Sequence, residues 1–235
     1  MHVIRPLFFA SIALLAGCQL LGSQPEKAPA NLVRMQGELS TQNGQWQFRP
    51  CQEQRRFAVA DNSHSDLFEE ASALLHDGPG PLFADLRGQL GASAQSGSDG
   101  QFSVERFYRI QREGPACADP NFKRLTLHAS GHEPDWSVQV SRRGLVLTRP
   151  GKAPLALPYL EEQLPDGRFN LTSEANGQRL ELWVAPQRCV DNMSGTLQHL
   201  SAELRISGAA RGGDQPPRAD QVQRGCAYYG GARDK

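Results

Sequence analysis

The sequence predicts a mainly β protein, with a small barrel that contains one helix, followed by a second antiparallel β domain. Three observations carry this prediction. Runs of alternating apolar and polar residues recur along the chain, two Asn-Gly pairs are typical of hairpin turns, and one stretch has the apolar period of a helix. The length of 235 residues, with 23 glycines and 16 prolines, fits one large or two small domains of short strands.

The chain begins with a segment typical of a secretory signal. Arg5 supplies a positive charge, residues 7–15 are almost entirely apolar, and Ala16 and Gly17 are the small residues that a signal peptidase requires. The apolar run is about half of the roughly 20 residues that a membrane-spanning helix needs. We therefore expect residues 1–17 to be removed on export.

The end of this segment, Leu15-Ala16-Gly17-Cys18, resembles the lipobox of bacterial lipoproteins. The resemblance implies that the Cys18 thiol is lipidated and that two or more acyl chains then hold the protein on a membrane. The alternative is an ordinary signal with a chance cysteine. Gln19 stands where lipoproteins kept in the inner membrane often carry Asp, which favours the outer membrane. Residues 18–31 are rich in Pro, Ser and Ala, and are expected to form a lipidated tether.

The next segment, residues 32–119, is the predicted barrel domain. A hairpin turn is expected at Asn43-Gly44, and an amphipathic helix at 65–78 has Ser65 as its predicted N-cap and Gly78 as its stop. Five strands with one inserted helix are typical of a small, partly closed barrel. The expected strands lie at 33–39, 43–51, 55–59, 81–91 and 101–110.

Residues 120–230 are the predicted second domain, which is antiparallel and all β. A second Asn-Gly pair, at 176–177, is expected to join two strands within 168–189. Residues 207–225 have no periodicity and are expected to form a long exposed loop. Further strands are expected at 123–131, 135–140, 144–151, 197–206 and 225–231.

Four cysteines remain once Cys18 is set aside: Cys51, Cys117, Cys189 and Cys226. An even number in an exported chain predicts disulfides, and three pairings are open. The sequential pairing keeps each bond inside one half of the chain, where it would contribute roughly 3–4 kcal/mol. A zinc site is the alternative, but zinc ligands favour close pairs such as C-x-x-C, and these cysteines are far apart.

Two resemblances cover most of the mature chain. The run MQGELSTQNGQWQFRPC, the helix after it and LFADLRGQL resemble the oligonucleotide/oligosaccharide-binding (OB) domain of envelope-stress lipoproteins in proteobacteria. This implies an OB-like fold more than a function. The runs ASGHEPDWSVQV, ELWVAPQRCVDNMSG and RGCAYYGG resemble proteobacterial outer-membrane or periplasmic lipoproteins, which implies a place in the cell envelope and no particular activity.

The segment HASGHEPDW contains the candidate binding residues His132, Glu133 and Trp136. Gly131 and Pro134 oppose the helix that His128 and His132 would need in order to share a metal. We therefore predict no metal site and no cofactor. Two interpretations remain, a structural turn with Trp136 in the core, or a surface that binds a ligand through His132, Glu133 and Trp136.

No catalytic set stands out in the sequence. Ser194 lacks the first glycine of a G-x-S-x-G elbow, so Asp191 and Ser194 are expected to cap a turn rather than to act with His199. Glu161, Glu162 and Asp166 could serve glycoside hydrolysis, but such clustered acids are usually a solvated face. We therefore expect a protein that is not an enzyme.

The charged residues balance at a formal net charge of zero, which gives no reason to expect a nucleic-acid partner. Two short basic spots, Arg55-Arg56 and Arg142-Arg143, could contact lipid phosphates or stay solvated. The sequence thus predicts a lipoprotein anchored to the outer membrane and facing the periplasm, with a structural, envelope-stress or binding role. The alternative is a binder or inhibitor of a periplasmic enzyme or glycan, similar to lysozyme inhibitors.

Overall fold

The computed structural model describes residues 31–51, 53–62, 65–114, 116–175, 177–208 and 221–233. The predicted signal segment 1–17, Cys18, the tether up to residue 30 and Asn176 lie outside these ranges. Within them, no helix is long and apolar enough to cross a membrane.

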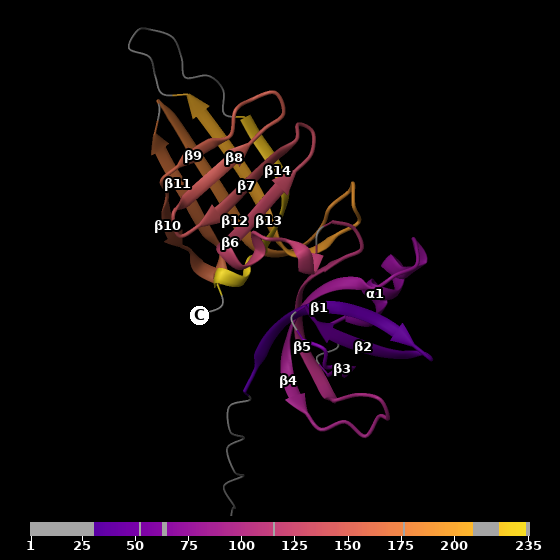
Figure 1. The fold of residues 1–235 in the computed structure, drawn as a ribbon. Coiled ribbons are helices and arrows are strands. Elements are labelled where there is room, and N and C mark those ends of the chain that lie inside the picture. Colours follow the sequence, from indigo (N-terminus) through magenta and orange to yellow (C-terminus); the bar gives the residue numbers. More distant parts are fainter. Residues whose placement is uncertain are drawn as a thin grey trace, which may run out of the picture. The chain divides into compact units, whose positions relative to one another are not determined.

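The first half forms a closed five-stranded barrel with one helix (Figure 1). Antiparallel pairs join β1 to β2, β2 to β3, β1 to β4 and β4 to β5, and the parallel pair of β3 with β5 closes the ring. The helix lies between β3 and β4 in the chain, which is the arrangement of an OB fold. The predicted OB-like barrel is therefore confirmed. Its elements are β1 Val33–Gln42, β2 Gln45–Pro50, β3 Phe57–Asp61, α1 Leu67–His76, β4 Leu82–Gly91 and β5 Gly100–Gln111.

Local sequence explains the turn and the helix of this barrel. Asn43 and Gly44 have φ values of 51° and 76°, as a tight hairpin turn between β1 and β2 requires. The helix begins one residue later than predicted, because the Ser65 hydroxyl donates to Asp61 and Asp66 occupies the N-cap position without a side-chain cap. Helix α1 buries Leu67, Ala71 and Leu74 against the barrel core.

The second half forms one antiparallel sheet that curls around a common core. Its strand order is β10-β11-β12-β13-β14-β6-β7-β8-β9, and every strand except β10 sends side chains into the same hydrophobic cluster. This confirms the predicted second antiparallel β region. Its strands are β6 Leu125–Gly131, β7 Trp136–Ser141, β8 Gly144–Thr148, β9 Leu155–Leu157, β10 Leu160–Gln163, β11 Phe169–Ala175, β12 Gln178–Val190, β13 Leu197–Gly208 and β14 Gln221–Tyr229.

The predicted loop at 207–225 is too long. Strand β13 continues to Gly208 and β14 begins at Gln221, and the apolar period is hidden because the buried Gln223 is polar and the exposed Val222 is apolar. The interval between these strands lies outside the described residues. Short 3-10 helices complete the fold at η1 Ala116–Ala118, η2 Phe122–Arg124, η3 Pro165–Gly167 and η4 Gly231–Arg233.

The two hydrophobic clusters belong to one compact unit, Leu32–Lys235. Strand β13 pairs with β5, and Leu197 of β13 is buried in the barrel core. Arg34 of β1 donates to Asp85 at 2.7 and 2.5 Å and to the Tyr229 carbonyl at 3.0 Å. The division of this unit into domains at 119/120 stays a prediction.

Two disulfides join Cys51 to Cys117 and Cys189 to Cys226. The prediction of disulfides is confirmed, and of the three open pairings the structure has the sequential one. The second bond ties the end of β12 to β14, and it forms part of the candidate site.

Candidate binding cleft

A cleft of about 670 Å³ lies on the outer face of the second sheet, where β12, β13 and β14 run side by side. Leu182 and Val184 point into the core, so Trp183 between them faces outward. Trp183 pairs with Glu203, which pairs with Arg224, so these three side chains cross the face in one row. The cleft therefore has a floor that combines an aromatic ring with charges of both signs.

Trp183 is the large aromatic side chain in this cleft, and its surface is 36% exposed. The Arg205 guanidinium lies 5.8 Å from the centre of its ring, and Arg205 also donates to Glu203 at 2.6 and 2.8 Å. The indole nitrogen of Trp183 lies 3.5 Å from a carboxylate oxygen of Glu181. These contacts hold the ring beside polar groups, which is the mixture that small-molecule sites present.

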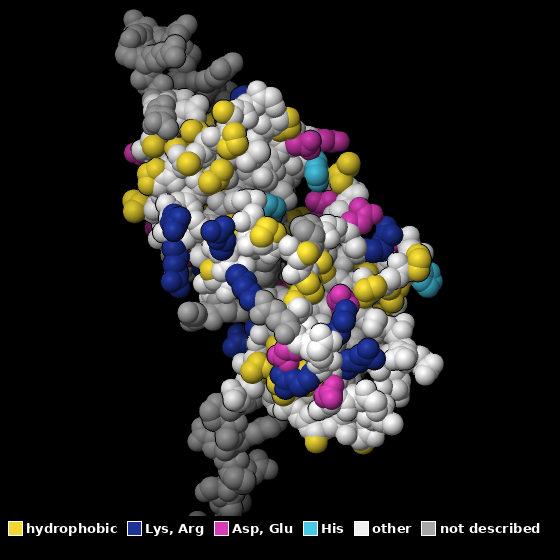
Figure 2. Space-filling model, viewed as in Figure 1, with side chains coloured by type: hydrophobic (Ala, Val, Ile, Leu, Met, Phe, Trp, Pro, Cys, Tyr) yellow, Lys and Arg dark blue, Asp and Glu magenta, His cyan; other side chains and the backbone are white. Residues whose placement is uncertain are grey.

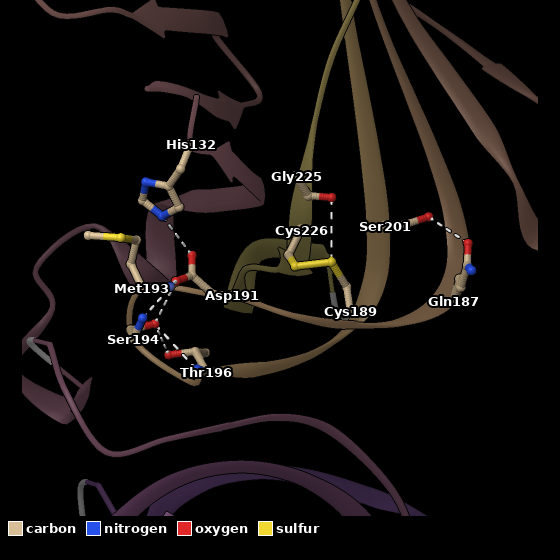
Figure 3. The surroundings of a disulfide bond; sticks show 10 residues. All are labelled: His132, Gln187, Cys189, Asp191, Met193, Ser194, Thr196, Ser201, Gly225 and Cys226. Atoms are coloured by element: carbon tan, nitrogen blue, oxygen red, sulfur yellow. Dashed lines mark hydrogen bonds and ion pairs between the residues drawn. A yellow bond between two sulfur atoms is a disulfide. The ribbon is translucent and has the colours of Figure 1, made fainter. Parts of the chain in front are cut away.

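The turn that follows the disulfide forms one wall of the cleft (Figure 3). Asp191 Oδ1 accepts hydrogen bonds from the Met193 amide at 2.9 Å, from the Ser194 amide at 2.8 Å and from the Ser194 hydroxyl at 3.1 Å. The Gly195 amide donates to the Asp191 carbonyl at 2.8 Å. The prediction that Asp191 and Ser194 cap a turn is confirmed, and the turn presents Met193 with 77% of its surface exposed.

His132 joins this wall to the turn between β6 and β7. Its Nε2 lies 3.1 Å from Asp191 Oδ2, as Figure 3 shows, and its Nδ1 lies 2.9 Å from Asp135 Oδ1. The hydrogen bond to Asp135, together with that to Asp191, raises the pKa of His132. Burial opposes ionisation of Asp191, but the hydrogen bonds from Ser194, His132 and Met193 outweigh it and lower the pKa of Asp191. Each partner thus favours the charged form of the other.

The strands β14 and β6 approach closely beneath this wall. A Cβ atom on Gly225 would lie 1.9 Å from the Ser130 carbonyl oxygen, and one on Gly131 would lie 2.2 Å from the Arg224 carbonyl oxygen. Only glycine fits such spacing. The Cys189 sulfur lies 3.5 Å from the Gly225 carbonyl oxygen, so the disulfide packs directly over this narrow pair of strands.

The structure separates the three candidate residues that the sequence singled out. His132 and Glu133 line the cleft, but Trp136 does not, because it is only 3% exposed and packs in the core of the second sheet. Of the two interpretations that the sequence left open, the structure agrees with Trp136 in the core, so a binding surface here does not include Trp136. Sequence reasoning missed Trp183, although the alternation of Leu180, Leu182 and Val184 places it on the outer face.

The other candidate residues have partners of their own. The Ser194 hydroxyl bonds to Asp191 and Thr196, whereas His199 Nδ1 donates to the Tyr108 carbonyl at 2.8 Å. Glu161 pairs with Arg233 at 2.8 Å, and Asp166 lies 3.4 Å from Arg168. Within the described ranges, no group of three His, Cys, Asp or Glu side chains is placed to hold a metal ion.

Comparisons with protein-family models, with curated proteins and with solved structures find no match to this chain.

Proposed function

We propose that this protein is a lipoprotein, held through Cys18 on the periplasmic side of the outer membrane, that acts by binding rather than by catalysis. The lipobox and Gln19 support the anchoring. The cleft beside the Cys189–Cys226 disulfide supports a binding role, because it combines the exposed ring of Trp183 with charged side chains that form ion pairs.

The exposed ring of Trp183 is the observation that carries the proposal. An outward indole next to Glu203, Arg205 and Arg224 can pack on the apolar face of a sugar ring while the charged groups bond its hydroxyls. A periplasmic lipoprotein also works beside the glycan of the cell wall. A glycan is therefore the ligand class that we propose for the cleft.

A second candidate is binding or inhibition of a periplasmic enzyme through Met193. The turn that carries Met193 is held by Asp191, by His132 and by the disulfide, so little conformational entropy remains to be lost on binding. A rigid turn with a projecting apolar side chain is a suitable anchor for a protein partner. The two candidates thus place their main contact on different residues.

A pull-down of the mature protein with insoluble peptidoglycan and with immobilised lysozyme tests both candidates. Glycan binding predicts retention on peptidoglycan that falls at least about tenfold in Trp183→Ala, since a buried aromatic contact contributes more than about 1.4 kcal/mol. Enzyme binding predicts retention on lysozyme that falls in Met193→Ala. Leu160→Ala, which removes an 80% exposed side chain outside the cleft, is the control. Retention on neither matrix, or equal retention of all variants, would refute a binding role for this cleft.

A further inference from the structure

A second groove, distinct from the cleft, carries four positive charges. It has a volume of about 580 Å³, and its basic side chains come from the end of η2 and from the turn between β7 and β8. Lys123 and Arg124 belong to the first segment, Arg142 and Arg143 to the second, and all four are exposed. Two segments that are close only in the folded chain thus bring their cations together.

These cations have no acidic partner in the part of the chain that the structure describes. The groove is lined by no Asp or Glu, and none of the four side chains forms an ion pair with another described residue. Several arginines elsewhere are paired: Arg49 with Glu38, Arg179 with Glu174 and Glu181, and Arg188 with Glu70. In a chain whose formal net charge is zero, this groove is a local excess of positive charge.

Such an excess has a direct chemical consequence. Like charges that face one groove repel each other, and an anion between them removes the repulsion and gains an attraction from each. Guanidinium groups bind phosphate with paired N–H donors, and Lys binds it as a point charge. The groove therefore suits a ligand with one or more phosphate groups.

The groove lies near the first described strand of the fold. Gly231 and Ala232 line the groove, and Arg34, near the first described residue, donates to the carbonyl of Tyr229 at 3.0 Å. Lys and Arg side chains gather near the described C-terminal end in Figure 2. The described chain thus begins on the side of the fold that carries the groove.

We propose that Lys123, Arg124, Arg142 and Arg143 bind the phosphates of anionic lipid headgroups on the membrane that anchors the protein. The proposal rests on the anchoring that is part of the proposed function. It adds an orientation: the groove contacts the bilayer, and two contacts of different kinds, acyl chains and charges, hold the protein there.

Vesicle sedimentation tests the groove independently of lipidation. The full chain carrying Cys18→Ala is mixed with phosphatidylcholine vesicles, or with vesicles that also contain phosphatidylglycerol. The N-terminal segment, which carries Arg5, is the same in every variant, so the change in preference between variants reports the charges of the groove. We expect a preference for the anionic vesicles that falls about 30-fold in Arg142→Gln/Arg143→Gln, at about fivefold for each charge.

Arg55→Gln/Arg56→Gln is the matched control, because it removes the same net charge from an Arg-Arg pair outside the groove. This variant should keep the preference of the parent. An equal loss in both double variants, or no preference in the parent, would overturn the proposal. No preference in the parent, together with measurable binding of soluble pyrophosphate, would identify a site for free phosphates instead. Lipid labelling of Cys18 is measured separately, so failure of the groove and failure of the anchor are distinguishable.

Discussion

Acid should destabilise this fold through two histidines, His128 and His199, that the structure keeps neutral. Burial, and then the nearby Arg109, lower the pKa of His128 to about 4. Burial also lowers the pKa of His199 to about 4, because the hydrogen bond to the Tyr108 carbonyl opposes burial but does not outweigh it. Both rings pack against tyrosines, His128 on Tyr228 and His199 on Tyr108.

The size of the effect follows from the difference between folded and unfolded pKa values. An unfolded histidine has a pKa of about 6.5. Between this value and the folded pKa of about 4, both histidines are therefore protonated in the unfolded chain but neutral in the folded chain. Since the folded pKa is depressed, the stability is fully present above about pH 6.5 and is lost as the pH falls towards about 4. Each histidine should cost about 2 kcal/mol at pH 5 and about 3 kcal/mol at pH 4.

Urea unfolding of the parent, His128→Gln and His199→Gln between about pH 7.5 and pH 4.5 measures this effect. Each variant should lose about 2.5 kcal/mol less than the parent over this range, whatever its stability at neutral pH, because glutamine does not titrate. Carboxylates contribute equally to all three proteins and cancel in the comparison. If both variants show the same pH dependence as the parent, the histidines are not buried in neutral form.

Three further predictions follow from single contacts. Cys189→Ser/Cys226→Ser opens a bond with a sequence separation of 37 and should cost about 4 kcal/mol in urea unfolding; a cost below about 1 kcal/mol would mean the bond constrains little. Asp191→Ala should speed amide exchange at Met193 and Ser194 about fivefold, since each hydrogen bond contributes about 1 kcal/mol, and unchanged exchange would contradict the capping role. Arg34→Ala leaves Asp85 buried and should cost about 3–5 kcal/mol, unlike the exposed Arg49→Ala, which should cost less than about 1.

Regular alternation made most of the fold predictable. The strands around Leu39, Phe102 and Leu182 have clear apolar periods, and the Asn43-Gly44 turn sets the register of its hairpin. The strands β9 and β10 escaped prediction because they are three and four residues long, and β10 is exposed throughout. The start of α1 differed because Ser65 bonds to Asp61 instead of capping the helix.

The candidate site was harder to predict because it depends on contacts between distant segments. His132 and Asp191 are 59 residues apart, and the ring of Trp183 gains its neighbours only through the register of β12 with β13. The run around Trp136 has the same alternation as the run around Trp183, but its aromatic residue falls on the core face. Which tryptophan is exposed therefore follows from the face that each strand buries.

Lipidation of Cys18 is the claim on which the location of the protein and the role of the basic groove both depend. Metabolic labelling with a radioactive fatty acid, followed by separation of inner and outer membranes, tests it in the parent and in Cys18→Ala. We predict a labelled parent in the outer membrane, and a variant that carries no label and leaves that fraction. A variant that stays in the outer membrane like the parent, or a parent without label, would contradict the claim.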